Sequence, residues 1–260
     1  MDCKKSNLYT KTGDNGMSSL YNGERVKKDS VYFECLGDLD ELNSNLGLVK
    51  AFWRDEMDSS IIKLYNAPGA GAMFYKHEKC VDSGKYYEWF SLSKYIHEIQ
   101  CNLMNISTQI ATPIQMGSIT QNSTLNSTQN TTLNTTQNTT DWVKKVGLET
   151  NIISTLEKNI DRLDSILPPI KNFVVPSGNK LISQIHVCRS ITRRCERTYV
   201  RILNWGDLSN STENDILIEQ MNIPKIYLNR LSDYFFALSR FVAMTLEVEE
   251  DLYSRNFNKK

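Results

Sequence analysis

The sequence has few histidines and no paired metal-binding motif. None of its three histidines, His77, His97 and His186, follows a glutamate at a spacing of three, whereas helical bundles that hold two irons need paired Glu-x-x-His motifs. Its six cysteines form no Cys-x-x-Cys pair, which argues against a structural zinc site. We therefore expect no protein ligands for a metal and interpret the cysteines as reduced structural thiols. Cys188 and Cys195, seven residues apart, fit the buried face of one helix.

The sequence also lacks an excess of charge and a long apolar run. Thirty basic residues balance thirty acidic ones, so no global field attracts the chain to nucleic acid or to an anionic membrane. The apolar stretch at residues 235–246 contains Arg240 and is shorter than the roughly 20 residues that span a bilayer. No apolar h-region follows Met1, as a secretory signal would require. We expect a cytoplasmic protein without nucleic-acid or membrane partners, or a mitochondrial one if a leader has been removed.

Two segments lack the pattern of a packed element. Residues 121–140 repeat Gln, Asn, Ser and Thr with only two leucines, which is too little apolar surface to offset the entropy of ordering. We predict that residues 114–141 are a disordered, Asn/Thr-rich insertion. Residues 66–90 contain Pro-Gly-Ala-Gly and no regular period, which predicts an irregular loop insertion. The chain as a whole, with 40% hydrophobic residues, predicts a single domain over residues 1–260.

Apolar residues recur at three- and four-residue steps along the rest of the chain, which predicts an all-α bundle of about five helices. Asp38 and Glu41 have the spacing of a capping box and predict that the first helix begins there. Pro113 and Pro168 follow the second and third periodic segments and predict their ends. Pro224 suits the first turn of the last helix. The other expected helices cover residues 92–110, 148–167, 177–203 and 224–250.

A Gly-rich segment at residues 9–20 precedes these helices. It reads Tyr-Thr-Lys-Thr-Gly-Asp-Asn-Gly-Met-Ser-Ser-Leu. Glycines between polar residues allow backbone N–H groups to point into one concavity, which suits phosphate oxygens. The segment lacks the spacing of a Walker A or Rossmann motif, so from these residues alone an ordinary turn explains it at least as well.

The expected helix at residues 177–203 carries an arginine-rich stripe. Five arginines lie between positions 189 and 201, with Glu196 as the single acid, so pairs four residues apart cannot neutralise them. The arginines either form a solvated basic face with acidic partners on other segments or bind the oxygens of a phosphate chain. Asn229, on the last expected helix, is a candidate to bind a nucleotide or a metal-bound phosphate beside them.

Five ordered motifs resemble those of the PduO-type ATP:cob(I)alamin adenosyltransferases. They are Tyr-Thr-Lys-x-Gly-Asp-x-Gly-x-Ser at residues 9–18, Gly-x-x-Asp-Glu-Leu-Asn at 37–43, Asn-Phe-Val-Val-Pro-x-Gly at 172–178, His-Val-x-Arg-x-x-x-Arg-Arg-x-Glu-Arg at 186–197 and Tyr-Leu-Asn-Arg-Leu-Ser-Asp at 227–233. Both insertions lie outside the similarity. The resemblance implies a helical homotrimer that transfers the 5′-deoxyadenosyl group of ATP to cob(I)alamin and releases inorganic triphosphate.

The resemblance also implies roles for single residues. ATP, with Mg²⁺, would be bound by the Gly-rich loop and two helices through Thr10, Lys11, Thr12, Gly13, Ser18, Ser19, Lys28, Arg193, Arg194, Glu196, Arg197 and Asn229. Arg193 would also stabilise the leaving triphosphate. Asp40 would pair with Arg189 across a subunit boundary near the corrinoid. Phe173 would lie below the corrin ring and keep a lower axial ligand off the cobalt.

Two other interpretations stay open. A non-catalytic carrier that delivers adenosylcobalamin to a B12-dependent enzyme would bind the corrinoid without releasing triphosphate. A helical scaffold would not be stabilised by ATP. The intact loop and arginine stripe favour the enzyme, since neither alternative needs a triphosphate pocket. The enzyme would work with a reductase and a B12-dependent enzyme as protein partners.

Overall fold

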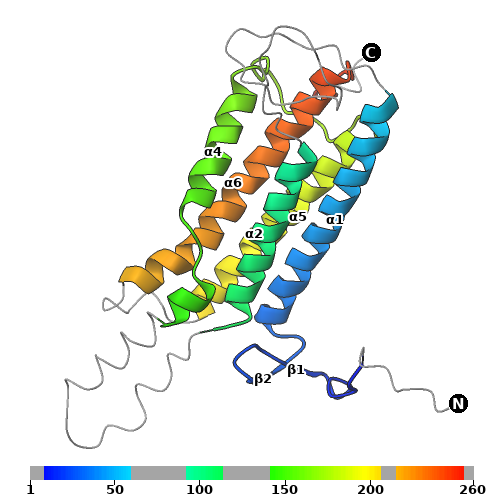
Figure 1. Ribbon diagram of the computed structural model, residues 1–260. Coiled ribbons are helices and arrows are strands. Elements are labelled where there is room, and N and C mark those ends of the chain that lie inside the picture. Colours follow the sequence, from blue (N-terminus) through cyan, green and yellow to red (C-terminus); the bar gives the residue numbers. More distant parts are fainter. Residues whose placement is uncertain (1–8, 60–91, 114–140, 206–214, 255–260) are drawn as a thin grey trace, which may run out of the picture.

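The computed structural model describes residues 9–59, 92–113, 141–205 and 215–254 (Figure 1). Its long helices are α1 (Val31–Ser59), α2 (Leu92–Ile110), α4 (Asn151–Asp164), α5 (Lys180–Trp205) and α6 (Asp215–Thr245). Two short strands, β1 (Met17–Ser19) and β2 (Arg25–Lys27), precede them. The predicted helical bundle is confirmed. The predicted loop insertion at 66–90 and the predicted disordered insertion at 114–141, apart from Asp141, lie outside the described residues.

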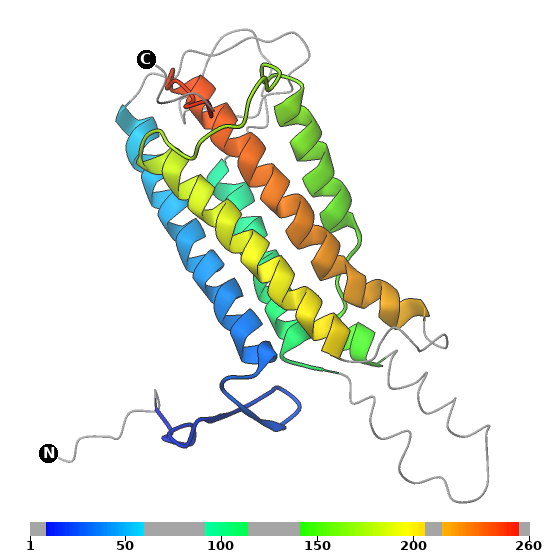
Figure 2. The same ribbon diagram turned by 180° about the vertical axis from the view of Figure 1, so that it is seen from behind.

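The long helices run alternately up and down along one bundle (Figures 1 and 2). α5 packs against both α1 and α6, α2 packs against α1, and α4 packs along α6. Leu46 of α1 and Ile106 of α2 have no exposed surface, because the apolar stripe of each helix faces its neighbours. Tyr95 of α2 meets Tyr234 of α6 edge to face, with ring centroids 5.3 Å apart. These contacts enclose a core between α1, α2, α5 and α6.

α1 begins at Val31, so the predicted capping box at Asp38 and Glu41 is wrong. Ser30 precedes the helix, and its Oγ accepts a hydrogen bond from the N–H of Phe33 at 3.5 Å, as an N-cap serine does. Asp38 and Glu41 lie inside α1, where both carboxylates pair with an arginine of α5. These two acids therefore join α1 to α5 and do not cap a helix.

α6 begins at Asp215, so the prediction that the last helix starts at Pro224 is also wrong. A proline inside a helix leaves the carbonyl four residues before it without its usual donor. That carbonyl belongs to Gln220, and Nε2 of Gln109 on α2 donates to it at 3.4 Å. The N–H of Leu148 donates to Oε1 of Gln220 at 2.7 Å. The Gln109 side chain thus satisfies the carbonyl that the proline leaves free, and the bond from Leu148 holds the Gln220 side chain beside it.

A short antiparallel hairpin of β1 and β2 at the N-terminal end was not predicted. Gly23 in its turn has a φ of 86°, a conformation that favours glycine, and the pair Asn22-Gly23 is a hairpin signal. The N–H of Tyr21 donates to the carbonyl oxygen of Ala111 at 2.7 Å. The hairpin is therefore attached to the end of α2.

The other helices follow their predicted ranges more closely. α2 covers the predicted 92–110, α4 is shorter than the predicted 148–167, and α5 extends two residues beyond 203. Cys188 and Cys195 are fully buried in α5, as their spacing predicted. Within the ranges that the structure describes, no helix combines the length and apolar character needed to cross a membrane.

Candidate active site

The N-terminal loop forms a cluster of cations around one glycine. Nη2 of Arg25 donates to the carbonyl oxygen of Thr12 at 2.7 Å, and its Nη1 donates to Oγ of Ser19 at 3.3 Å. The side chain of Lys28 lies beside Gly13, where an added Cβ would be 3.1 Å from the Lys28 Nζ. Gly13 therefore leaves room for an ammonium group next to the backbone.

The other predicted loop residues lie close by in the chain and are largely accessible. Thr10, Lys11 and Thr12 are exposed, and Ser18 is half-buried in β1. The hydroxyl oxygens of Thr10 and Thr12 are 2.8 Å apart, and Lys11 has a φ of 60°, which bends the backbone sharply. Between residues 9 and 28 the chain carries four cations and two acids. Hydroxyls, backbone turns and excess positive charge in one place suit a polyphosphate.

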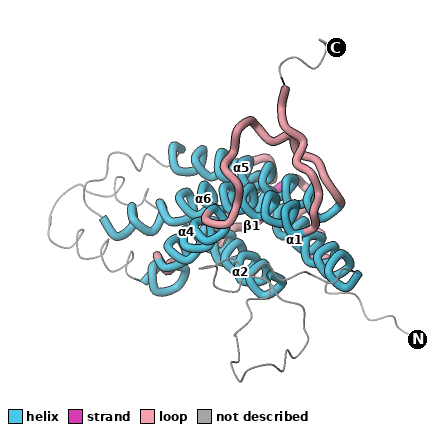
Figure 3. The backbone as a smooth tube through the Cα atoms, turned by 90° about the horizontal axis from the view of Figure 1, so that it is seen from above, coloured by secondary structure: helices cyan, strands magenta, loops and turns pink. Residues whose placement is uncertain are grey.

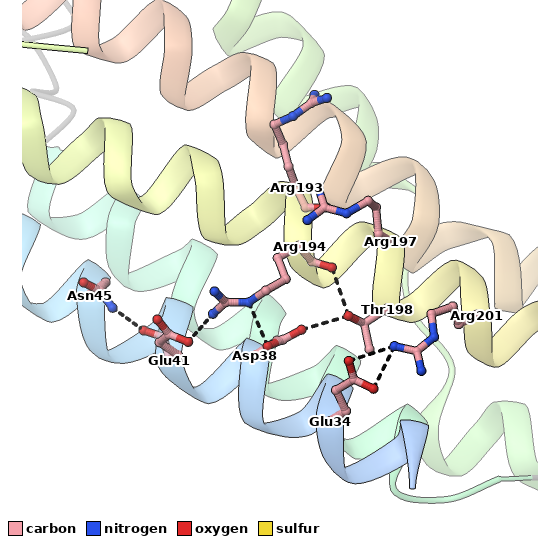
Figure 4. Close-up of polar contacts among 9 residues, drawn as sticks. All are labelled: Glu34, Asp38, Glu41, Asn45, Arg193, Arg194, Arg197, Thr198 and Arg201. Atoms are coloured by element: carbon pink, nitrogen blue, oxygen red, sulfur yellow. Dashed lines mark hydrogen bonds and ion pairs between the residues drawn. The ribbon is translucent and has the colours of Figure 1, made fainter. Parts of the chain in front are cut away.

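The side of α5 that faces α1 is occupied by ion pairs (Figure 4). Arg194 donates from Nε to Oδ1 of Asp38 at 2.9 Å and from Nη2 to Glu41. Thr198 donates from Oγ1 to the other oxygen of Asp38 at 2.8 Å. Arg194, predicted to bind ATP, therefore has two carboxylate partners within the chain, and its role at ATP stays a prediction.

The outward side of α5 carries arginines without acidic partners. Arg201 is not one of these arginines, because its Nη1 donates to both carboxylate oxygens of Glu34 on α1 at 2.7 Å. Arg193 and Arg197 are exposed, and neither forms an ion pair with any residue that the structure describes. Nη1 of Arg197 donates to the backbone carbonyl of Arg193 at 3.0 Å. Figure 4 shows Arg193 pointing away from α1. These two guanidiniums are available to an anionic ligand.

Arg189 lies toward α6, against the ring of Phe236, whose centroid is 6.0 Å from the guanidinium carbon. Burial, and then the charge of Arg193, lower the pKa of Arg189, while Asp233 acts in the opposite direction. Its buried Nε has no hydrogen-bond partner within the described residues. Asp40, the predicted partner, is exposed on α1, and no ion pair joins it to Arg189 within the described chain.

Asn229 and Glu196, both predicted to bind ATP, are in direct contact. Nδ2 of Asn229 donates to Oε1 of Glu196 at 2.9 Å, and Oδ1 of Asn229 accepts from Nη1 of Arg230 at 2.7 Å. Arg230 also donates from Nε to Oε1 of Glu157 at 3.0 Å. A chain of polar contacts thus runs from α4 through α6 to α5 and orients the Asn229 amide.

Phe173 lies at the opposite end of the bundle from the N-terminal loop. The loop adjoins the start of α1, whereas the segment between α4 and α5 that contains Phe173 crosses the other end (Figures 1 and 3). α5 has 26 residues and is about 39 Å long. Phe173 is 82% exposed. The structure brings Gly13 to Lys28 and Asn229 to Glu196, but it separates the loop from Phe173 within one chain.

Three residues of this arrangement were missed by the sequence prediction: Arg25, Asp38 and Glu157. The Asn-Gly turn could have identified the hairpin that carries Arg25. Asp38 was noticed only as a cap. Glu157 lies 73 residues from Arg230, and no local pattern links two residues at that separation.

The described residues contain no group of three His, Cys, Asp or Glu side chains placed to hold a metal ion. Burial raises the pKa of the Cys35 and Cys188 thiols to about 12, so both are protonated and unreactive at neutral pH. Mg²⁺ commonly binds through substrate phosphates and one or two carboxylates. A Mg²⁺ that arrives on ATP would therefore not need such a group.

Comparisons with known proteins identify the family of the chain. The sequence model of the cobalamin adenosyltransferase family matches residues 8–242. The human corrinoid adenosyltransferase MMAB is 30% identical over 249 residues, which cover 96% of this chain and 74% of the human protein. The corrinoid adenosyltransferase of Bacillus subtilis is 28% identical and covers 96% and 93% of the two chains.

Solved structures of corrinoid adenosyltransferases are similar to this chain as well. One is a variant PduO-type ATP:corrinoid adenosyltransferase from Lactobacillus reuteri in complex with cobalamin and ATP. It is 25% identical, aligns with a TM-score of 0.59 and covers 96% of this chain and 97% of its own. A second variant of that enzyme, with the same two ligands, aligns with a TM-score of 0.57. The chain therefore belongs to the cobalamin adenosyltransferase family.

Proposed function

We propose that this protein transfers the 5′-deoxyadenosyl group of ATP to the cobalt of cob(I)alamin. The cobalt electron pair attacks C5′, a Co–C bond forms while the C5′–O bond breaks, and the electrons of that bond leave with inorganic triphosphate. In a chain of this family, the observation that carries the proposal is the pair of exposed guanidiniums, Arg193 and Arg197, without acidic partners among the described residues. The corrinoid supplies the nucleophile, and the protein orients ATP and stabilises the leaving group.

ATP would be held mainly through its phosphates. Lys11 and Lys28 in the loop and Arg193 on α5 supply positive charge, which charge-assisted hydrogen bonds to phosphate require. Mg²⁺ on the triphosphate would offset its negative charge. The amide of Asn229, oriented by its contact with Glu196, would bind from α6. The wider predicted set of loop residues stays a prediction that alanine substitution can test.

The corrinoid would lie near Phe173. An aromatic side chain that is 82% exposed is free to cover a corrin face and to keep an axial ligand off the cobalt. A four-coordinate Co(II) is then easier for a reductase to convert to Co(I). The unpartnered Nε of Arg189 and the exposed carboxylate of Asp40 support their predicted pairing between subunits.

A homotrimer would assemble the complete site. The loop and Phe173 lie at opposite ends of one chain, so a neighbouring copy is needed to bring the two regions together. A Lys11→Ala, Gly13→Ala double variant and Arg193→Ala should each be nearly inactive. If the loop and the helix come from different chains, mixed trimers should recover roughly a quarter of wild-type activity. Mixed trimers that stay inactive would place both elements of a site in one chain.

An anaerobic assay with chemically reduced cobalamin and MgATP tests the proposed reaction. We expect adenosylcobalamin and inorganic triphosphate in equal amounts. The alternative, a carrier of adenosylcobalamin, predicts corrinoid binding with no triphosphate. A scaffold predicts that ATP does not raise the melting temperature.

The cellular setting is part of the same proposal. The reaction needs a reductant for cobalt and an acceptor for the product, which a reductase and a B12-dependent enzyme would provide. We expect these partners in the cytoplasm, or in mitochondria if a leader has been removed, and no nucleic-acid or membrane partner. Cell fractionation with an antibody against the protein tests the location.

A further inference from the structure

The chain that follows α6, residues 246–254, folds back over the end of the bundle; we call it the C-terminal segment. Glu247 has a φ of 56°, and the N–H of Val248 donates to the carbonyl oxygen of Ala243 at 2.9 Å. A residue of positive φ with this bond is the Schellman ending of a helix. The ending sends the C-terminal segment across α5 and α6 instead of into solvent.

The C-terminal segment pairs with the segment that carries Phe173. An antiparallel bridge joins Val174 to Leu252. The N–H of Tyr253 donates to the carbonyl oxygen of Phe173 at 2.7 Å, and the N–H of Val175 donates to that of Asp251 at 2.7 Å. Figure 3 shows the two loops side by side. Since the Phe173 ring is mostly exposed, these backbone bonds fix where it is held.

One buried arginine fastens both segments to α6. Arg240 is 5% exposed, and its Nε donates to Oε1 of Glu250 at 2.9 Å. Its Nη2 donates to the carbonyl oxygen of Pro168 at 2.9 Å and to Oε2 of Glu250 at 3.3 Å. Pro168 lies in the connection between α4 and α5 that leads to Phe173. A single guanidinium thus links that connection, the C-terminal segment and the rigid helix between them.

The C-terminal segment also covers part of α5. His186 belongs by helical spacing to the same stripe as exposed Arg193, yet it is 5% exposed. Val174, Ser239 and Glu250 line a small cavity together with His186. The C-terminal segment therefore contributes to the core at this end, and its removal would disturb the packing of α5 and α6 there.

We propose that the Arg240–Glu250 ion pair is a clasp that holds the C-terminal segment against residues 173–175 and thereby positions Phe173. Arg240 and Glu250 are positioning residues, because they would act on Phe173 through the backbone bonds of residues 173–175. The inference rests on the proposed function for the role of Phe173. Its structural part, the link from the clasp to residues 173–175, can be tested without any activity.

The test compares Glu250→Gln with Glu249→Gln, a neighbouring change of equal charge at an exposed residue. Hydrogen exchange of the Val175 and Tyr253 amides reports the bridge directly. We expect Glu250→Gln to speed both by about tenfold, because opening the bridge exposes them, and Glu249→Gln to leave them unchanged. Unchanged exchange in Glu250→Gln would overturn the clasp, whether or not the protein proves to be an adenosyltransferase.

Kinetics then test the consequence for Phe173. Starting from cob(II)alamin and a reductase, Glu250→Gln should be about tenfold slower, since small displacements of positioning groups are costly. Starting from prereduced cob(I)alamin, we expect a loss below about twofold. Equal losses in the two assays would overturn the positioning role. Failure of the wild-type protein in both assays would instead contradict the proposed function.

A second pair of variants covers the case in which Glu250→Gln fails to fold around the buried Arg240. Tyr253→Pro removes the N–H that donates to Phe173 and leaves the ion pair intact, whereas Tyr253→Ala keeps that N–H. We expect the selective loss from cob(II)alamin in Tyr253→Pro beyond any loss in Tyr253→Ala. Identical behaviour of the two variants would overturn the proposal.

Discussion

The α1-facing side of α5 and its outward side carry the same side chain in different surroundings. Arg194 and Arg201 meet carboxylates of α1, whereas Arg193 and Arg197 form no ion pair within the described chain. All four lie within three turns of one helix. The difference comes from what α1 presents: acids at positions 34, 38 and 41 occupy the arginines in their reach. The arginines that these acids do not reach have no carboxylate partner within the described chain and can bind an anionic ligand.

This comparison separates stability from function along one helix. A carboxylate held by two donors links α1 to α5, so its loss should lower the free energy of unfolding. An exposed guanidinium stays hydrated and contributes little to folding, so its loss should affect ligand binding instead.

Arg193→Ala should lower the rate of adenosylation from cob(I)alamin by about 10²–10³-fold, because a lost charge contact to the leaving group costs about 2–4 kcal/mol. Its melting temperature should stay close to that of the wild type. Single-turnover kinetics and calorimetry measure the two effects. A normal rate would remove Arg193 from the site, and a large fall in melting temperature would show that Arg193 also supports the fold.

Asp38→Ala should lower the free energy of unfolding by about 1–3 kcal/mol, since it leaves Arg194 and Thr198 without their shared acceptor. Urea denaturation measures the change. Asp161→Ala, at an exposed acid of α4, is the matched control and should stay within about 0.5 kcal/mol. Equal stability of the two variants would show that the α1–α5 pairs do not support the fold.

His186 lies on the same stripe of α5 as Arg193 but is buried, so we expect it to affect stability. Burial, and then the charge of Arg189, lower the pKa of His186 below its usual 6.5, while Glu250 acts in the opposite direction. The unfolded chain therefore binds this proton more readily. The contribution of His186 to stability is present above pH 6.5 and is lost as the pH falls below it. The melting temperature of His186→Gln should fall less on acidification than that of the wild type, and parallel falls would contradict this.

Arg201→Ala should have the smallest effect. Its ion pair with Glu34 is exposed, with side-chain exposures of 58% and 46%, so about 0–1 kcal/mol of stability should be lost. Adenosylation should stay within about twofold of the wild-type rate. Stopped assays at saturating substrates measure that rate, and a loss comparable to that of Arg193→Ala would place the triphosphate nearer α1.

The sequence predicted best where a contact is local. α2 covers its predicted range because its apolar period and Pro113 act within a few turns. The start of α1 was missed because Asp38 and Glu41 have the spacing of a cap, although they pair with an arginine of α5 and the capping residue is Ser30. The start of α6 was missed because a distant donor satisfies the carbonyl that Pro224 leaves free. Asp38 binds an arginine 156 residues away, and Gln109 satisfies a carbonyl 111 residues away.

The site was predictable in kind but not in arrangement. Arginine spacing indicated an anion site, but it could not show that α1 binds Arg194 and leaves Arg193 exposed. The C-terminal segment has no pattern that predicts its pairing with residues 173–175. Such contacts depend on how the helices meet in space, and no short window of the sequence encodes that.

Calorimetric titration of MgATP into the wild type, Arg193→Ala and Arg201→Ala measures binding without chemistry and therefore tests whether the two sides of α5 differ in function. We expect Arg193→Ala to weaken binding by about 2 kcal/mol, as for the loss of a hydrogen bond to a charged group. Arg201→Ala should bind MgATP as the wild type does. Equal weakening in both variants, or none in either, would contradict the division of α5 into a structural side and a ligand-binding side.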